Sequence, residues 1–270
     1  MQTYPTRPQA APLALNVPLE QQLRERTAEL EAARAELVDF AYSISHDLRA
    51  PLRSIVGFAK VIEEDYADRV DAEGRDALHR VRAAARKMAE QLDDMLKLSR
   101  VSRSELTREP VDLGDLAREI ATELEAAAPR PGVVFDIAPG LVGWGDRRLL
   151  ALLLQNLLGN AWKFTSAHAS ARIEIGVTSA AGEPAYFVRD DGAGFDMADA
   201  RRLFNPFQRL HGTAEFPGTG IGLAIVRRIV QRHGGRVWAE GALEKGATFY
   251  FTLPGARIET QAPVREAALT

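Results

Sequence analysis

A heptad repeat near the N-terminus is the sequence feature that most restricts the folds open to this chain. Leu23, Leu30, Leu37 and Ile44 recur at intervals of seven, and the residues between them are largely charged. A hydrophobic repeat that continues over about four heptads favours a coiled coil, although a single helix lying on its own domain remains an alternative. The repeat runs into the following segment without a break, so we predict one helix over about 19–66.

A histidine followed by an acid, His46-Asp47, lies in this predicted helix, and Pro51 follows five residues after the histidine. With Ile44 on the buried seam, a step of two residues turns His46 about 200° toward solvent. A lone histidine on a polar helix face is usually an ordinary surface residue. Pro51 removes one backbone donor, so we expect a kink there.

A second helix is predicted over about 72–103, after the polar stretch ADRVDAEG. Two helices with a short connection form an antiparallel hairpin, and one hairpin cannot bury both apolar stripes. Two copies complete a four-helix bundle, so we expect a homodimer. The apolar residues of the second helix form two series at intervals of seven, which are Leu78, Ala85 and Leu92, and Val81, Met88 and Met95.

Strand and helix patterns alternate after a polar linker at 105–110 and predict a separate domain over 111–254. Asp146 is a plausible N-cap for the longest helix of this domain. The expected class is α+β, with a helical region over 19–104 followed by an α/β sandwich of one mixed sheet with helices on one face. Residues 1–18 and 255–270 are expected to be tails. Strands are predicted at about 110–113, 133–137, 171–178, 185–189, 236–239 and 247–253, helices end near 127, 164 and 233, and 190–218 is predicted to be a long irregular loop.

The composition excludes several classes of protein. A net charge of −3 argues against nucleic acid as the main partner. The absence of cysteine excludes disulfides and thiolate metal sites, and fits a reducing compartment. No apolar run is long enough for a membrane span, and the first residues do not resemble a signal peptide. We therefore expect a cytoplasmic location, with membrane attachment possible for a longer parent protein.

Three polar residues share one face of the predicted helix that begins near Asp146. Asn156, Asn160 and Lys163 are spaced at i, i+4 and i+7. Asparagine is unfavourable inside a helix because its side chain competes with the backbone for hydrogen bonds. These residues could hold a hydrated Mg²⁺ against phosphates, although a solvated face explains them equally well on their own.

Two glycine-rich stretches follow. In the first, DDGAGF, Asp190 ends a predicted strand and could accept the exocyclic amine of adenine, although many tight turns have this pattern. In the second, GTGIGL, the glycines lead directly into a helix, where free N–H groups and the helix dipole favour an anion. A dinucleotide fold is rejected, because its glycines would follow the first strand of a βαβ unit rather than a long loop.

Together these stretches resemble the two-component sensor histidine kinases, whose GHKL-type ATP-binding domain is related to that of gyrase. SHDLRAPL resembles the phosphoacceptor box of the family, NLLGNAWKFT its asparagine box and LFNPFQRLH its phenylalanine box. DDGAGF and GTGIGL resemble its two glycine boxes. Any one box is moderately specific, but all five occur in order and the likeness spans about 19–254.

The resemblance implies a role for individual residues. His46 is expected to be the phosphoacceptor, and Asp47 the acid that orients the imidazole and takes its proton. Asn160 is expected to ligate Mg²⁺, Asp190 to contact adenine, and Thr248 to line the adenine pocket. Further nucleotide contacts are implied for Asn156, Lys163, Gly192, Gly194, Arg209, Gly218, Thr219, Gly220, Gly222 and Leu223, with Phe204 and Phe207 holding a mobile lid.

The implied activity is autophosphorylation of His46 from Mg²⁺-ATP, followed by transfer to an aspartate on the receiver domain of a response regulator. An upstream sensor domain or partner would supply the signal, and transfer within or between protomers stays open. Many family members have Thr or Asn where this chain has Ala50, so weak receiver-phosphatase activity is expected. The alternatives are a dimeric ATP-binding scaffold without autokinase activity, and a chaperone or topoisomerase ATPase, in which the His46 hairpin would have no place.

Overall fold

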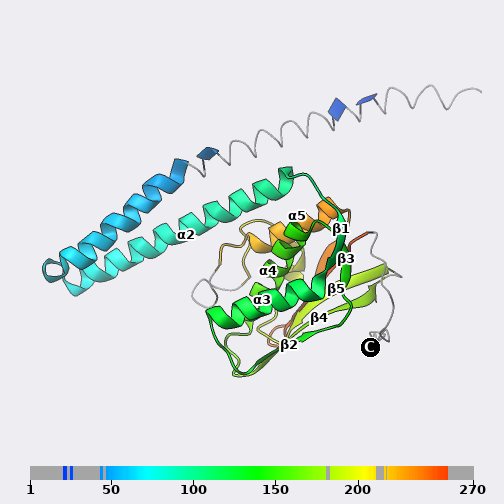
Figure 1. Cartoon of the computed structure of the whole chain (residues 1–270). Helices are drawn as coiled ribbons and strands as arrows, with labels where there is room; N and C mark the ends of the chain where they lie inside the picture. Colours follow the sequence, from blue (N-terminus) through cyan, green and yellow to red (C-terminus); the bar gives the residue numbers. More distant parts are fainter. Residues whose placement is uncertain are drawn as a thin grey trace, which may run out of the picture.

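The computed structural model describes residues 21–22, 25–26, 43–44, 47–180, 183–210, 216 and 218–254. His46 and three of the four heptad positions lie outside the described residues, so the coiled coil and the position of the phosphoacceptor stay predictions. The described part consists of a long helical hairpin and an α/β domain that lies against the C-terminal half of its second helix (Figure 1).

The end of the first helix and both ends of the second lie close to the predicted positions, whereas the predicted start of the first helix lies outside the described residues. Its first helix covers residues 47–65 and is helical on both sides of Pro51. A short 3-10 turn, η1 (Ala67–Arg69), leads to α2 (Ala72–Arg103), whose bounds are those predicted. Asp71 caps α2, because its side chain accepts a hydrogen bond from the backbone N–H of Gly74 at 2.8 Å.

Ion pairs join the two helices of the hairpin. Arg49 donates to Asp93 at 2.7 Å, and Arg82 pairs with Glu63. A stripe of large apolar side chains on both helices is nevertheless exposed, with Phe58 71% exposed. The other large members of this stripe within 47–103 are Leu48, Ile55, Val61, Ile62, Val81 and Met88.

The α/β domain has a mixed sheet, as predicted. Its strand order is β2-β4-β5-β7-β6, with β2 parallel to β4 and all other neighbours antiparallel. The strands are β2 (Val133–Ile137), β4 (Ala171–Ala180), β5 (Glu183–Asp190), β6 (Val237–Gly241) and β7 (Ala247–Phe251). A separate antiparallel ribbon joins β1 (Glu109–Asp112) to β3 (Val142–Gly145). The sequence did not predict β3, since its four residues VGWG include two glycines and carry little strand signal.

Three helices cover one face of this sheet (Figure 1). They are α3 (Leu113–Ala127), α4 (Arg147–Phe164) and α5 (Gly222–His233). The leucines of α4 occupy the centre of the core, with Leu150 and Leu153 fully buried. A second 3-10 turn, η2 (Met197–Arg202), lies within the predicted irregular loop. The α5 helix begins two residues later than predicted because Gly220 has φ +77°, and it ends as predicted at Gly234, with φ +82°.

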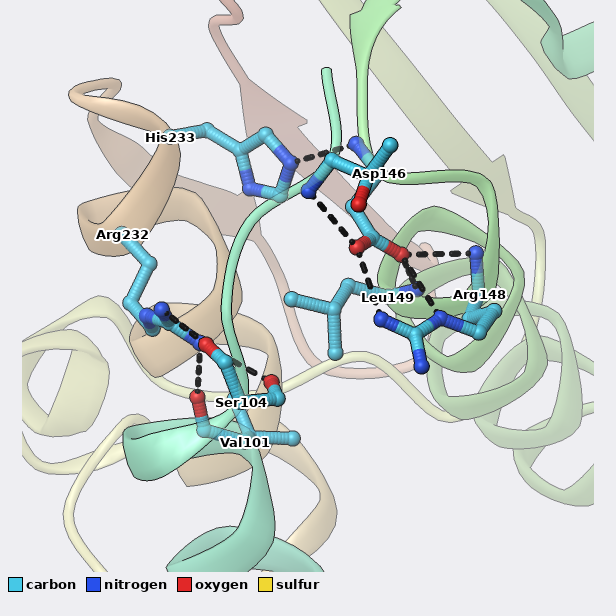
Figure 2. Close-up of polar contacts among 8 residues, drawn as sticks. Val101, Ser104, Asp146, Arg148, Leu149, Arg232 and His233 are labelled. Carbon is cyan, nitrogen blue, oxygen red and sulfur yellow. Dashed lines mark hydrogen bonds and ion pairs between the residues drawn. The ribbon is translucent and has the colours of Figure 1, made fainter. Parts of the chain in front are cut away.

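The linker after α2 is held on the α/β domain (Figure 2). Nη1 of Arg232 donates to the carbonyl of Val101 at 2.6 Å and to Oγ of Ser104 at 3.0 Å, so α5 supplies donors to the C-terminal end of α2. The backbone N–H of Thr107 donates to the carboxylate of Asp146 at 3.2 Å. Asp146 also caps α4, as predicted, by accepting from two backbone N–H groups of that helix.

Among the described residues no helix is long and apolar enough to cross a membrane.

Candidate functional site

A cavity of about 420 Å³ lies where α4, α5 and the ends of β5 and β7 meet, with α2 along one side. This volume is in the usual range for sites that hold a small molecule. Predicted site residues that line it are Asn156, Asn160, Lys163, Asp190, Gly194, Arg209, Gly218, Thr219, Gly220, Gly222 and Leu223.

At one end of the cavity a carboxylate lies among apolar side chains. Asp190 ends β5, is 4% exposed, and accepts a hydrogen bond from the backbone N–H of Gly192 at 3.0 Å. Burial raises the pKa of Asp190 to about 6, against the opposing effect of the Gly192 hydrogen bond. Ala247 and Phe249 of β7 line the same region. A flat base with an exocyclic amine would find apolar contacts and one acceptor here.

Gly192 and Gly194 let the chain turn sharply behind this carboxylate. A Cβ atom at Gly192 would lie 2.4 Å from the carbonyl oxygen of Phe164. At Gly194, where φ is +63°, a Cβ would lie 1.9 Å from the carbonyl oxygen of Ala242. Only glycine fits these two positions. Gly194 lines the cavity, whereas Gly192 stands behind its wall and is absent from the lining.

Thr248 does not line the cavity, and this expectation has to be corrected. Its hydroxyl accepts a hydrogen bond from Nε of Arg189 at 3.2 Å, beside the exposed guanidinium. Successive side chains of a strand point to opposite faces of a sheet. Because Ala247 and Phe249 face the cavity, Thr248 between them must face the other side.

The three polar residues of α4 lie along the floor of the cavity. Nζ of Lys163 donates to Oδ1 of Asn160 at 3.3 Å, and Nδ2 of Asn156 donates to the carbonyl of Leu152 at 2.7 Å. Burial, together with repulsion by Arg209, lowers the pKa of Lys163 to about 8. A cation whose charge is this poorly solvated gains from an anionic ligand, and carboxamide oxygens are suitable ligands for Mg²⁺.

Another part of the lining, where Lys163 and Arg209 meet the turn before α5, is rich in cationic groups and backbone donors. Gly218 and Gly220 have positive φ and carry the chain into the N-terminus of α5. Arg209 folds over this turn and donates to the carbonyls of Phe216 at 2.5 Å and Gly218 at 2.9 Å. The combination of two cations with a helix N-terminus suits phosphate groups.

The two phenylalanines expected to hold a lid differ in environment. Phe204 is buried and packs edge-on against Phe249, with ring centroids 6.5 Å apart. Phe207 is 55% exposed and has φ +63°. Residues 211–215 and 217, between these aromatics and the glycine turn, lie outside the described residues.

One wall of the cavity was missed by sequence reasoning. It is formed by Glu90, Asp93, Asp94 and Lys97 of α2. Oδ2 of Asp94 accepts a hydrogen bond from Oγ1 of Thr219 at 2.7 Å. The heptad pattern of α2 places these four residues on its polar side. The pattern does not distinguish a charged residue that faces solvent from one that faces another domain.

Two protein families match separate parts of the chain. Residues 36–104 match the family described as His Kinase A (phospho-acceptor) domain, which covers the hairpin. Residues 145–257 match the family described as Histidine kinase-, DNA gyrase B-, and HSP90-like ATPase, which covers most of the domain that contains the cavity.

Curated relatives resemble most of the chain. Cyanobacterial phytochrome B of Nostoc sp. is 35% identical over 86% of this chain and 31% of the relative. The methanogenesis regulatory histidine kinase FilI of Methanothrix harundinacea is 35% identical over 86% of this chain and 26% of the relative. The adaptive-response sensory kinase SasA of a Synechococcus strain is 32% identical, over 88% of this chain and 66% of the relative. The chain thus spans less than a third of the first two relatives.

Solved structures agree with these matches. Full-length ShkA in complex with AMPPNP is 28% identical and superposes with a TM-score of 0.57, covering 79% of this chain and 45% of that one. The histidine kinase AdeS of Acinetobacter baumannii, at 20% identity and a TM-score of 0.53, has the same fold over 78% of this chain. With both family matches in their expected order, the chain belongs to the two-component sensor histidine kinases, and carries a phosphoacceptor hairpin followed by a GHKL-type ATP-binding domain.

Proposed function

We propose that this chain is the core of a histidine kinase that transfers the γ-phosphoryl group of ATP to Nε2 of His46. The observation that carries the proposal is the mixed lining of the cavity. Asp190 lines it beside Ala247 and Phe249, whereas Lys163 lines it next to Gly218 in the turn before α5. A purine base suits the first group of residues and a triphosphate the second, and Arg49 of the phosphoacceptor box pairs with Asp93, which lines the cavity.

The proposed chemistry is a direct displacement. The lone pair on Nε2 of His46 attacks the γ-phosphorus, the bond to the β,γ-bridging oxygen breaks, and ADP leaves with its electron pair. The ring proton on Nδ1 passes to Asp47, the next residue in the chain. An imidazole with an ordinary pKa near 6.5 is mostly neutral at physiological pH, as a nucleophile must be. Positioning and charge neutralisation supply most of the catalysis in such a reaction.

The residues of α4 fit a Mg²⁺ ion bound with the nucleotide. Oδ1 of Asn160 already contacts a cationic group, Nζ of Lys163, at 3.3 Å. A carboxamide oxygen that contacts one cation suits another, so Asn160 would hold the ion, with Asn156 one helical turn away. When bound, Mg²⁺ would neutralise part of the charge on the phosphates. Lys163 would contribute a further positive charge from the same helix face.

A homodimer is proposed from the hairpin. The apolar stripe that includes Phe58 and Val81 is exposed on both helices of one chain. Exposed apolar surface of this extent marks an interaction site, and a second hairpin offers the same stripe in return. The resulting four-helix bundle would bury both stripes.

The proposed acceptor of the phosphoryl group is an aspartate on the receiver domain of a response regulator, with input from an upstream sensor or partner. Ala50 has no polar side chain with which to position water against a phosphorylated receiver. We therefore propose weak receiver-phosphatase activity. Efficient dephosphorylation of a cognate receiver that is unaltered in Ala50→Thr would contradict this.

The phosphoryl transfer is tested with γ-labelled ATP and Mg²⁺ on the full chain. The expected product is protein-bound label that is lost in acid, stable in base, and absent from His46→Gln. His79→Gln is the matched control, because His79 is an exposed histidine of the same hairpin. Label that persists in His46→Gln, or that also disappears in His79→Gln, would contradict the assignment. A chain that binds ATP without acquiring label would instead be an ATP-binding scaffold.

A further inference from the structure

The carboxylate of Asp94 lies at the end of the cavity that is suited to phosphates. Its Oδ2 accepts the 2.7 Å hydrogen bond from Oγ1 of Thr219, the residue between Gly218 and Gly220. The side chain of Asp94 is 21% exposed, and its Oδ1 accepts from Nζ of Lys97 at 2.8 Å. A helix of the hairpin therefore places an anion against the turn that leads into α5.

This turn is where an anion gains most. The first N–H groups of α5 have no partner within the helix, and the helix dipole favours negative charge at its N-terminus. Thr219 belongs to the same local structure, since its Oγ1 accepts from the backbone N–H of Ile221 at 3.3 Å. A phosphate oxygen bound at this turn would compete with the Asp94 carboxylate for the hydroxyl of Thr219.

The segment of α2 that carries Asp94 contacts the first helix of the hairpin on one side and α5 farther along. Its neighbour Asp93 pairs with Arg49, which stands in the phosphoacceptor box SHDLRAPL. Farther along α2, Nε of Arg228 on α5 donates to Oγ of Ser102 at 3.0 Å. The Arg49–Asp93 pair thus joins this wall to the first helix of the hairpin, and the Arg228–Ser102 contact joins α2 to the ATP-binding domain, while the Asp94–Thr219 bond closes the phosphate end.

We propose that Asp94 is an intramolecular competitor of the ATP triphosphate and forms an autoinhibitory gate at the proposed nucleotide site. With α2 docked, its carboxylate occupies the hydroxyl of Thr219 and repels the negative charge of a phosphate group. Tight binding of ATP therefore requires α2 to withdraw from Thr219, and a signal that moves the hairpin changes the affinity for ATP. By linkage, bound ATP weakens the docking of α2 by the same factor.

The test distinguishes an effect on the binding of phosphates from an effect on the binding of the base. Asp94→Asn keeps the size of the side chain and a hydrogen-bond acceptor but removes the charge. Binding of ATP and of adenosine to the full chain is measured by calorimetry. We expect Asp94→Asn to lower the Kd for ATP by at least about fivefold and to leave the Kd for adenosine unchanged. Asp76→Asn is the charge-matched control, an exposed acid about five turns earlier on α2, and should change neither.

Two outcomes would overturn the gate. An unchanged ratio of the two affinities in Asp94→Asn would show that the carboxylate does not compete with phosphates. Weaker ATP binding with normal adenosine binding would show that Asp94 assists the nucleotide, for instance through its metal. The gate rests on the proposed function, and the binding of adenosine distinguishes failure of the gate from failure of the proposed function. If the unaltered chain binds neither ligand, the proposed function fails, whereas normal binding of both without an effect of Asp94→Asn refutes only the gate.

A cross-link provides an independent measurement. The chain contains no cysteine, so Ser102→Cys/Arg228→Cys offers each chain one pair of thiols to a short bifunctional reagent that ties α2 to α5 and leaves Asp94 and Thr219 in place. Cross-linking should weaken ATP binding at least about fivefold relative to the same variant before treatment and leave adenosine binding intact. Equal ATP binding before and after the cross-link would contradict competition between α2 and the triphosphate.

Discussion

The backbone N–H of Asp146 donates a hydrogen bond of 3.0 Å to Nε2 of His233, deep between α4 and α5 (Figure 2). The other ring nitrogen, Nδ1, lies 2.8 Å from the carbonyl oxygen of Ile229 and must donate to it. The imidazole is thus held neutral, with its proton on Nδ1. Burial, followed by repulsion from Arg108 and Arg232, lowers the pKa of His233, although Asp146 and the Ile229 carbonyl oppose this.

This arrangement predicts loss of stability in mild acid. The folded protein binds a proton at His233 less readily than the unfolded chain, whose imidazole has a pKa near 6.5. The stabilisation is therefore present above about pH 6.5 and lost as the pH falls below it. We expect His233→Gln to cost about 1–3 kcal/mol in urea unfolding at pH 7.5 and to flatten the pH dependence between 5 and 7. The exposed His79→Gln serves as control, and an equal flattening there would contradict the assignment.

The buried carboxylate of Asp190 is expected to lower the stability of the ligand-free protein and to be required for binding of the adenine base. Its folded pKa of about 6 lies above the unfolded value, so the stability due to its protonated form is present below about pH 4 and lost as the pH rises through 6. Asp190→Asn should stabilise the ligand-free protein by about 1–3 kcal/mol at pH 7.5 and abolish adenosine binding. Thermal unfolding and calorimetry check the two effects. A destabilised variant, or one that still binds adenosine, would refute this role.

The affinity for ATP should fall at alkaline pH. Lys163, with its pKa of about 8, is positive below that pH and becomes neutral above it. Between pH 7 and 9 we expect ATP binding to weaken by about tenfold, while adenosine binding stays constant. Lys163→Arg keeps the charge and should flatten the profile. If Lys163→Arg and the unaltered chain show the same pH dependence, another group is responsible.

The apolar stripe of the hairpin predicts a dimer that a single charge disrupts. Phe58 is the most exposed large apolar residue of the hairpin. Phe58→Glu should shift the full chain from dimer to monomer by sedimentation velocity, because a carboxylate cannot be buried in the bundle without a partner. Val134→Glu is the control, since Val134 is 59% exposed on the α/β domain. A dimer that survives Phe58→Glu would place the interface elsewhere.

Much of the fold follows from local patterns. The bounds of α2 follow from its apolar periodicity and polar flanks, and the start of α4 follows from the capping residue Asp146. The alternation of side chains along β7 also predicts the orientation of Thr248. Because Phe249 and Phe251 face the core, Thr248 faces the other side of the sheet. Resemblance alone placed Thr248 in the cavity, and alternation along the strand removes it.

The wall formed by α2 could not be predicted in this way. Asp94 and Thr219 are 125 residues apart in sequence, and their contact depends on how the hairpin meets the α/β domain. An amphipathic pattern shows which face of α2 is polar but not whether solvent or another domain covers that face. The short strand β3 was missed for a different reason, since pairing with β1 rather than its own propensity keeps it extended.

The position of the phosphoryl group on the chain tests the central claim most directly. After incubation with Mg²⁺-ATP, the full chain is digested at neutral to alkaline pH and the phosphorylated peptide is identified by tandem mass spectrometry. We predict one phosphoramidate, on His46, which is absent from Lys163→Met. When excess ADP is added, this phosphoryl group should be transferred to ADP and form ATP. Phosphate on a serine, threonine or another histidine, or none at all under conditions where ATP is bound, would contradict the account.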